Sequence, residues 1–176
     1  ILLHGVNLQY GDNPVVQFPG IEAIRTTGSN ISRILVKPET TTSELEAALV
    51  QAVSQNLFTI LTLDDPKLNC TDDEVAFSDA VKNTWLTKFL PVIYQDRFQG
   101  NMMISIARGW GPKDVDDAAS TGYKVYIDNY KTAIRAFRKG GFQIPIVIDA
   151  PCGTDYSAFA ADRGKELLAA DDEKNL

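Results

Sequence analysis

The stretch that decides the fold is NMMISIARGWG, residues 101–111. Its first part, MMISIA, is apolar on nearly every residue, which is typical of a strand that is buried on both faces of a parallel sheet. Its second part, RGWG, contains two glycines and predicts that the strand ends there. In α/β barrels the functional groups lie where strands end. Arg108 and Gly109 stand at this end, and neither offers a carboxylate, a thiol or an imidazole.

The rest of the chain repeats this alternation of a short apolar run and a helical period. Five strands are predicted, at 1–8, 31–38, 57–65, 101–107 and 143–150. Helices are predicted at 15–28, 43–53, 74–94, 123–139 and 157–170, with Ser43 and Glu46 forming a capping box. This is the pattern of five βα units in one domain, residues 1–176, with a parallel sheet surrounded by helices. A doubly wound sheet fits the same pattern, although no GxGxxG or GxxxxGK[ST] phosphate loop follows any strand.

Composition narrows the range of functions. The net charge of −6 argues against a nucleic-acid partner, which needs clustered Lys and Arg. No apolar run approaches the roughly 18 residues that span a bilayer. His4 is the single histidine, so a multi-histidine metal site is excluded and a Ser-His-Asp triad would depend on that residue. We expect neither a metal nor a cofactor.

The residues that follow the strands are the candidates for a functional rim, because parallel strands end at one edge of the sheet. Arg33 lies inside the second strand and needs a charged partner, for which Asp64 or Asp65 is expected; an ordinary structural ion pair is the alternative. Asp64, Asp65 and Asp149 could supply acid/base chemistry or bind a hard cation, but sequence alone specifies neither.

Three aromatic residues are predicted near the same rim: Tyr10, Trp110 and Tyr156. Flat aromatic faces suit sugar rings, and simple packing beneath the loops is the alternative for each. Trp110 is the preferred candidate because its glycine neighbours offer little side-chain cover.

Several segments together resemble the N-terminal part of family 5 glycoside hydrolases, (β/α)8 barrels that include cellulases and β-mannanases. They are LHGVNL (3–8), IEAIRTTGSNISRILV (21–36), LFTILTLDD (57–65), NMMISIARGWG (101–111) and YKTAIRAFRKGGFQIPIVIDAPCGTDYS (130–157). They occur in the family's order and spacing over nearly the whole chain. The resemblance implies a truncated TIM-barrel-like fold.

The resemblance also assigns residues. Arg33 falls on the family's active-site arginine, and Asp65 on the aspartate of a third-strand motif whose histidine is replaced by Asp64. The general acid/base position is Gly109, preceded by Arg108, and glycine cannot transfer a proton. The family's nucleophile follows a seventh strand, beyond the five units here, so no catalytic residue is expected.

The predicted function is therefore a non-catalytic, glycoside-hydrolase-like protein that binds β-linked polysaccharide or oligosaccharide at its rim. A secreted or cell-surface bacterial protein is expected. The alternatives are a structural or protein-interaction domain, or part of a hydrolase whose missing strands are supplied elsewhere. The resemblance slightly favours a disulfide between Cys70 and Cys152 over two free thiols. Exposed strand edges predict self-association, protection by the terminal segments, or a partner that completes the barrel.

Overall fold

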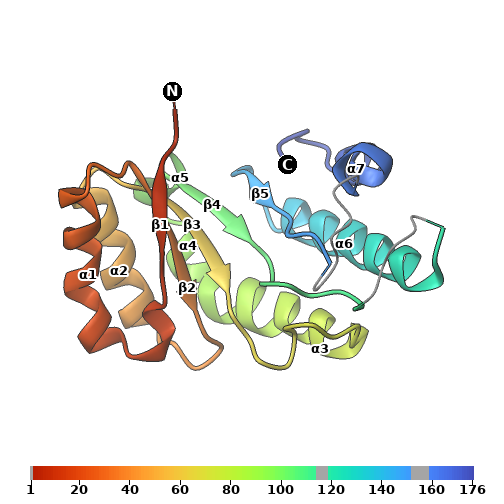
Figure 1. Cartoon of the computed structure of the whole chain (residues 1–176), viewed down its shortest axis with the longest axis horizontal. Helices are drawn as coiled ribbons and strands as arrows, with labels where there is room; N and C mark the ends of the chain where they lie inside the picture. The colour runs from red at the N-terminus through yellow and green to blue at the C-terminus, as the bar shows by residue number, and fades with distance from the viewer. Residues whose placement is uncertain (1, 114–118, 152–158) are drawn as a thin grey trace.

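The computed structural model describes residues 2–113, 119–151 and 159–176. Five strands form one parallel sheet, in the order β1-β2-β3-β4-β5 (Figure 1). They are β1 (Gly5–Leu8), β2 (Ile31–Val36), β3 (Phe58–Leu63), β4 (Met102–Ser105) and β5 (Ile146–Val147). This confirms the predicted five βα units. The sequential order has no point where it reverses, so the sheet is of the barrel type and the doubly wound alternative is wrong.

The connecting segments are mostly helical. They are η1 (Tyr10–Asp12), α1 (Pro14–Thr26), α2 (Thr42–Ser54), α3 (Glu74–Asp79), η2 (Ala80–Phe89), α4 (Leu90–Ile93), α5 (Asp96–Gln99), α6 (Thr121–Lys139) and α7 (Phe159–Ala169). The single helix predicted over 74–94 is an α-helix at both ends with a π-helical middle, η2. Within the described residues, no helix is long and apolar enough to cross a membrane.

The N-cap of α2 (Thr41) lies two residues before the predicted Ser43, and the helix itself begins at Thr42. The Thr41 hydroxyl accepts a hydrogen bond from the Glu44 N–H, and the Glu44 carboxylate accepts one from the Thr41 N–H. This reciprocal pair is the capping box, and its hydrogen bonds lower the pKa of Glu44. The predicted capping box of Ser43 and Glu46 is therefore wrong. Thr41–Glu44 and Ser43–Glu46 both have the required spacing, so the sequence does not distinguish them, and only the backbone geometry shows which pair forms the box.

Helix α6 has the most pronounced apolar face of the chain. The Ser120 hydroxyl caps it, and it ends at Gly140, which is followed by Gly141 with a φ of 89°. Its inward face is fully buried and rich in aromatic rings, through Tyr123, Tyr126, Ile127, Tyr130, Ile134 and Phe137. Such a face holds the helix against the sheet through hydrophobic burial.

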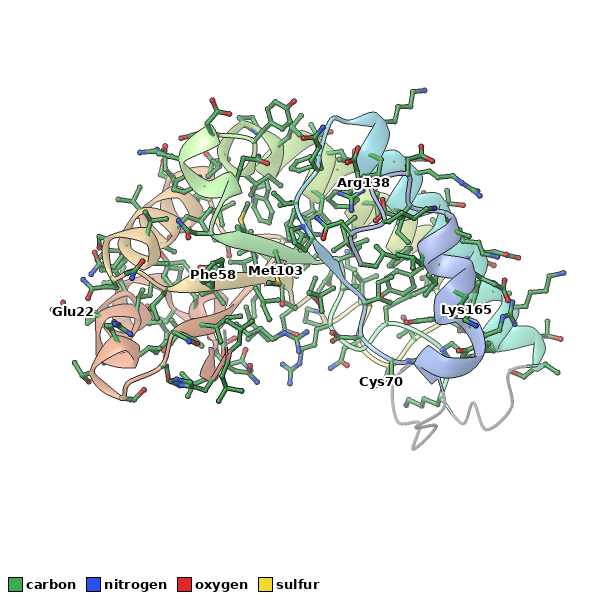
Figure 2. The ribbon with its side chains drawn as sticks, turned by 90° about the horizontal axis from the view of Figure 1, so that it is seen from above. Glu22, Phe58, Cys70, Met103, Arg138 and Lys165 are labelled. Carbon is green, nitrogen blue, oxygen red and sulfur yellow. The ribbon has the colours of Figure 1, made fainter. Side chains whose placement is uncertain are left out.

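The two faces of the sheet differ in how well they are covered. In one layer Leu61 of β3 pairs with Ile34 and Ile104, and all three are completely buried beneath the helices. In the alternate layer Ile60 pairs with Met103, and both are only half-buried. Met103 and Phe58, another half-buried residue of this second face, are labelled in Figure 2. The helices therefore cover one side of the sheet, as on the outside of a barrel.

Candidate functional site

Arg33 is the centre of the polar cluster at the carboxyl ends of the strands. Its Nη2 lies 2.7 Å from Asp149 Oδ2 and 3.0 Å from Asp149 Oδ1. Its Nε donates to Thr62 Oγ1 at 2.9 Å, and Nη2 also approaches Ser105 Oγ at 3.3 Å. The guanidinium of Arg33, which belongs to β2, thus contacts one residue of β3, one of β4 and one in the segment that follows β5.

The partner of Arg33 is therefore Asp149, and the expected pairing with Asp64 or Asp65 is wrong. Arg33 lies opposite Ile60 in the sheet, so Asp64 is four residues, or about 13 Å, further along β3. The arginine side chain reaches laterally across the half-covered face instead. Sheet curvature then brings the end of β5 within its reach.

Asp149 is held by several neighbours besides Arg33. The Tyr126 hydroxyl donates to its backbone carbonyl, and the Gly109 N–H lies 3.4 Å from Asp149 Oδ2. Burial, together with the nearby Asp149 charge, raises the pKa of both Tyr126 and Tyr130, which keeps these phenols neutral. The Tyr130 hydroxyl is buried, with no hydrogen-bond partner of good geometry among the described residues.

The two consecutive aspartates after β3 serve different partners. Asp64 Oδ2 accepts from Arg108 Nη1 at 3.1 Å, whereas Asp65 Oδ1 accepts from the Lys67 N–H at 2.9 Å. Arg108 is 41% exposed and Asp64 only 16%. Among the described residues, no group of three or more His, Cys, Asp or Glu side chains is placed to hold a metal ion. Asp64 therefore forms part of an ion pair, and Asp65 stabilises a turn.

The RGWG segment is shaped by backbone contacts. Arg108 N donates to Leu63 O at 2.8 Å, which extends the contact between β3 and β4 beyond Ser105. Gly109 adopts a φ of 59°, and its carbonyl accepts from Cys70 N at 2.9 Å. Gly111 has a φ of 134°, and a Cβ there would lie 2.8 Å from Tyr126. Glycine is needed at both positions because the backbone is left-handed at one and too close to a ring at the other.

Trp110 is not a rim platform, which corrects the sequence prediction. It is completely buried, and its ring stacks on Phe77 at a centroid distance of 4.0 Å. Its Nε1 donates to the carbonyl of Asp73 at 3.3 Å. The turn made by the flanking glycines directs the indole into the aromatic face of α6, where its ring also stacks with that of Tyr126 at a centroid distance of 5.8 Å. The packing alternative is the one that the structure supports.

Tyr10 requires the same correction. It is 2% exposed, and its hydroxyl donates to the backbone carbonyl of Glu44 at 2.9 Å. The buried phenol joins η1 to the first turn of α2, so its ring is unavailable to a ligand. Tyr156 lies outside the described residues.

Comparison with known proteins relates the fold of this chain to solved structures. No family model matches the chain, and no curated protein matches it. The fold matches the mannohexaose complex of the Thermomonospora fusca β-mannanase with a TM-score of 0.78, at 18% identity, over 99% of this chain and 58% of that one. A thermostable GH5 cellulase from an Icelandic hot spring isolate gives a TM-score of 0.67 at 13% identity, over 99% and 52%. A GH5-4 endoglucanase from Clostridium longisporum gives 0.66 at 12%, over 98% and 60%.

The chain shares their fold. It spans between 52% and 60% of the length of these three structures. The predicted resemblance to family 5 glycoside hydrolases is thus confirmed at the level of the fold, as a partial TIM-barrel-like sheet. In this glycoside-hydrolase fold, the position that the resemblance assigns to the acid/base residue is the left-handed Gly109.

Of the two cysteines in the predicted disulfide, only Cys70 lies among the described residues. Cys70 is disulfide-bonded and sits in the loop that pairs with Gly109. Cys152 lies outside the described residues, so its pairing with Cys70 stays a prediction.

Sequence reasoning missed the residues that orient Arg33 and Asp149. Thr62 and Ser105 could have been noticed because each carries a hydroxyl near the end of an otherwise apolar strand, and both are completely buried. Tyr126 and Tyr130 fall within the helix predicted at 123–139, and no pattern in the sequence distinguishes them as members of a site. Their place beside Asp149 depends on how α6 packs against the end of β5.

Proposed function

We propose that this chain is a non-catalytic, glycoside-hydrolase-like protein that binds β-linked polysaccharide at the rim around Arg33 and Arg108. The observation that carries the proposal is the glycine at the end of β4, in a sheet that otherwise has the fold of a β-mannanase. Glycosidic bond cleavage by this family needs a carboxylic acid there to protonate the leaving oxygen. Gly109 offers only backbone groups, and its carbonyl is already bonded to Cys70.

Neighbouring groups do not replace that acid. Arg108 cannot act as an acid at neutral pH because a guanidinium keeps its proton. The Asp149 carboxylate is bound by Arg33, and Asp64 is bound by Arg108. Both carboxylates are therefore already engaged by a guanidinium.

The same rim retains groups suited to binding hydroxyls. The side chains of Arg33 and Arg108 are 25% and 41% exposed, so each presents part of a planar, multi-donor guanidinium to solvent. The β-mannanase of matching fold is a complex with mannohexaose, a chain of hexoses that carries many hydroxyl acceptors. This supports a sugar chain as the ligand.

A protein-interaction domain is the second candidate. Two of the three aromatic residues expected to stack on sugar, Trp110 and Tyr10, are buried in the core. A rim that lacks them would bind sugar through hydrogen bonds alone. Part of an active hydrolase, with further strands supplied elsewhere, is the third candidate, in keeping with the share of the relatives' length that the chain spans.

Sedimentation with insoluble mannan and cellulose tests the proposal. The wild-type chain should bind, and Arg108→Ala should weaken binding about tenfold, the equivalent of one charged hydrogen bond. Arg97→Ala is the matched control, because Arg97 is 51% exposed, is paired with Glu46 and precedes the opposite end of β4. Its binding should equal that of the wild type.

The other outcomes separate the three candidates. Release of reducing ends from mannan or soluble cellulose by the purified chain would overturn the non-catalytic reading. Failure of the folded wild type to bind either polysaccharide would favour the interaction domain. Equal losses in the two arginine variants would show that binding is not located at the rim.

A further inference from the structure

The tripeptide pattern Asn-X-Ser/Thr, in which X is not proline, occurs twice in the chain. It is the acceptor sequence, or sequon, for N-linked oligosaccharides, which are bulky and are carried on surface loops of secreted proteins. One copy is Asn69-Cys70-Thr71, and the other is Asn30-Ile31-Ser32. The motif alone does not distinguish the two copies, so their surroundings in the fold decide which one can carry a glycan.

Asn69 lies in an exposed turn. Residues 66–70 form the turn that follows β3, and the side chain of Asn69 is exposed within it. Its backbone N–H donates to Asp65 O at 3.2 Å, and its Oδ1 lies 3.4 Å from Cys70 Sγ. Its Nδ2, the atom that bonds to the sugar, makes no hydrogen bond to any residue that the structure describes. A glycan on Nδ2 would therefore displace no hydrogen bond among those residues.

Asn30, in contrast, is embedded at the start of the sheet. Its Nδ2 donates to Leu2 O at 2.8 Å, and its Oδ1 accepts from His4 N at 3.0 Å. Its backbone groups are engaged as well, since Asn30 N donates to His4 O and Asn30 O accepts from Phe58 N. The hydroxyl residue of this copy, Ser32, is completely buried in β2. A glycan on Asn30 would break the bond to Leu2 at the point where β1 joins β2.

The middle residue of the first copy indicates the kind of compartment in which the chain matures. Cys70 is disulfide-bonded. Disulfides form and persist in oxidising compartments such as the lumen of the endoplasmic reticulum, and N-linked oligosaccharides are added on the same secretory route. The disulfide and the sequon at Asn69 therefore require the same compartment.

We propose that Asn69 is the acceptor of an N-linked oligosaccharide and that Asn30 is not. In the transfer, Asn69 Nδ2 forms a bond to the anomeric carbon of an oligosaccharide carried on a lipid diphosphate. The bond from that carbon to the diphosphate oxygen breaks, and the lipid diphosphate leaves with the bonding electron pair. Nδ2 gives up one proton to the transferring enzyme, so the step needs neither an oxidant nor a reductant.

The glycan is anchored beside the RGWG turn. Cys70 N donates to Gly109 O at 2.9 Å, and Gly111 N donates to Thr71 O at 2.8 Å. The last two residues of the sequon are thus bonded through their backbone to the turn that follows β4. The proposal does not depend on polysaccharide binding at the rim, because it concerns a covalent attachment to the outside of this loop.

Secretion of the chain from a eukaryotic host, behind a secretion signal, followed by peptide mass spectrometry tests the proposal. The secreted chain should carry one oligosaccharide, and an N-glycan amidase should remove it and leave an aspartate at position 69. Asn69→Gln should abolish the mobility shift on a denaturing gel. Thr71→Ser is the conservative control, because it keeps the hydroxyl of the sequon and should keep the glycan. Ser32→Ala removes the second sequon and should leave the shift unchanged.

Contrary results are equally clear. An unmodified Asn69 in the secreted, folded chain would overturn the proposal, and so would a glycan on Asn30 in that chain. A mobility shift that survives Asn69→Gln would place the glycan elsewhere. If a variant is not secreted, the peptide map of the wild type still decides, because it identifies the modified asparagine directly. None of these outcomes depends on sedimentation with mannan or cellulose, so the two proposals can fail separately.

Discussion

Replacing Arg138 by methionine should destabilise the protein more than any other single change of a charged residue in the described chain. The guanidinium donates to Asp171 at 2.6 and 2.9 Å and to the carbonyls of Phe142 and Ile144 at 2.8 and 2.9 Å. Methionine preserves most of the side-chain length and removes every donor. Because Asp171 is completely buried, its carboxylate would then lack its compensating charge.

Removing one partner of a buried ion pair costs about 3–5 kcal/mol, and the expected loss of unfolding free energy lies in that range. Arg97→Met is the control, because Arg97 and Glu46 form a pair that is 51% and 41% exposed. Exposed pairs contribute about 0–1 kcal/mol. The structure thus predicts a difference of at least about 2 kcal/mol between two substitutions of identical chemistry.

Urea unfolding at pH 7, followed by tryptophan fluorescence, measures both variants. The double variant Arg138→Met with Asp171→Leu should be less destabilised than the sum of its single changes, because no charge is left unpaired. It should not return to wild type, since the carbonyls of Phe142 and Ile144 still lose a donor. A loss for Arg138→Met no larger than that for Arg97→Met would refute the reasoning.

The same ion pair gives a pH signature. The hydrogen bonds from Arg138 outweigh the effect of burial and lower the pKa of Asp171. A carboxyl group whose pKa is depressed on folding contributes stability above its unfolded pKa of about 3.9, and that stability is lost as pH falls through the folded pKa. The difference between wild type and Arg138→Met should therefore be constant near neutral pH and shrink below about pH 4. A difference that grows on acidification would contradict this assignment.

Two further changes examine the RGWG turn, each by urea unfolding. Gly109→Ala should lower the free energy of unfolding by about 1–2 kcal/mol, because its φ of 59° is unfavourable for any residue with a Cβ. The control is Gly100→Ala, which should be close to neutral because Gly100 has a φ of −77° and open space around it. Equal losses in the two variants would show that the left-handed turn is unimportant. Trp110→Ala should cost about 3–5 kcal/mol through the cavity left against Phe77, and a loss below about 1 kcal/mol would place the ring at the surface instead.

Much of the fold could be predicted because it rests on local periodicity. MMISIA and LFTILTL read as strands since they are apolar on both faces, and the tyrosines of α6 recur at helical spacing. The βα pattern left the strand order open, since a doubly wound sheet fits it as well, and only the resemblance to family 5 glycoside hydrolases implied the sequential order of a barrel. The predicted N-cap of α2 was two residues too late, because Thr41 and Ser43 both precede a glutamate at the capping-box spacing.

The site was harder to predict, because its contacts join residues that are far apart in sequence. Arg33 and Asp149 are separated by 116 positions, and their meeting depends on the curvature of a five-stranded sheet. The direction of Trp110 depends on two glycines whose φ angles are set by contacts with the loop at Cys70 and Thr71. Neither the curvature of the sheet nor the φ angles of these glycines produces a local pattern in the sequence.

The sequence alone determined that this protein builds parallel βα units, and that Arg108 and Gly109 follow its fourth strand, where the resemblance to family 5 glycoside hydrolases implies an acid. Both follow from the identity and spacing of nearby residues. Only the tertiary structure decided which charges pair, that Trp110 and Tyr10 are buried, and that the carbonyl of Asn175 accepts a hydrogen bond from Ile146 of β5. Those outcomes depend on how the sheet curves and how helices pack across it, and these long-range geometries are fixed by the whole chain together.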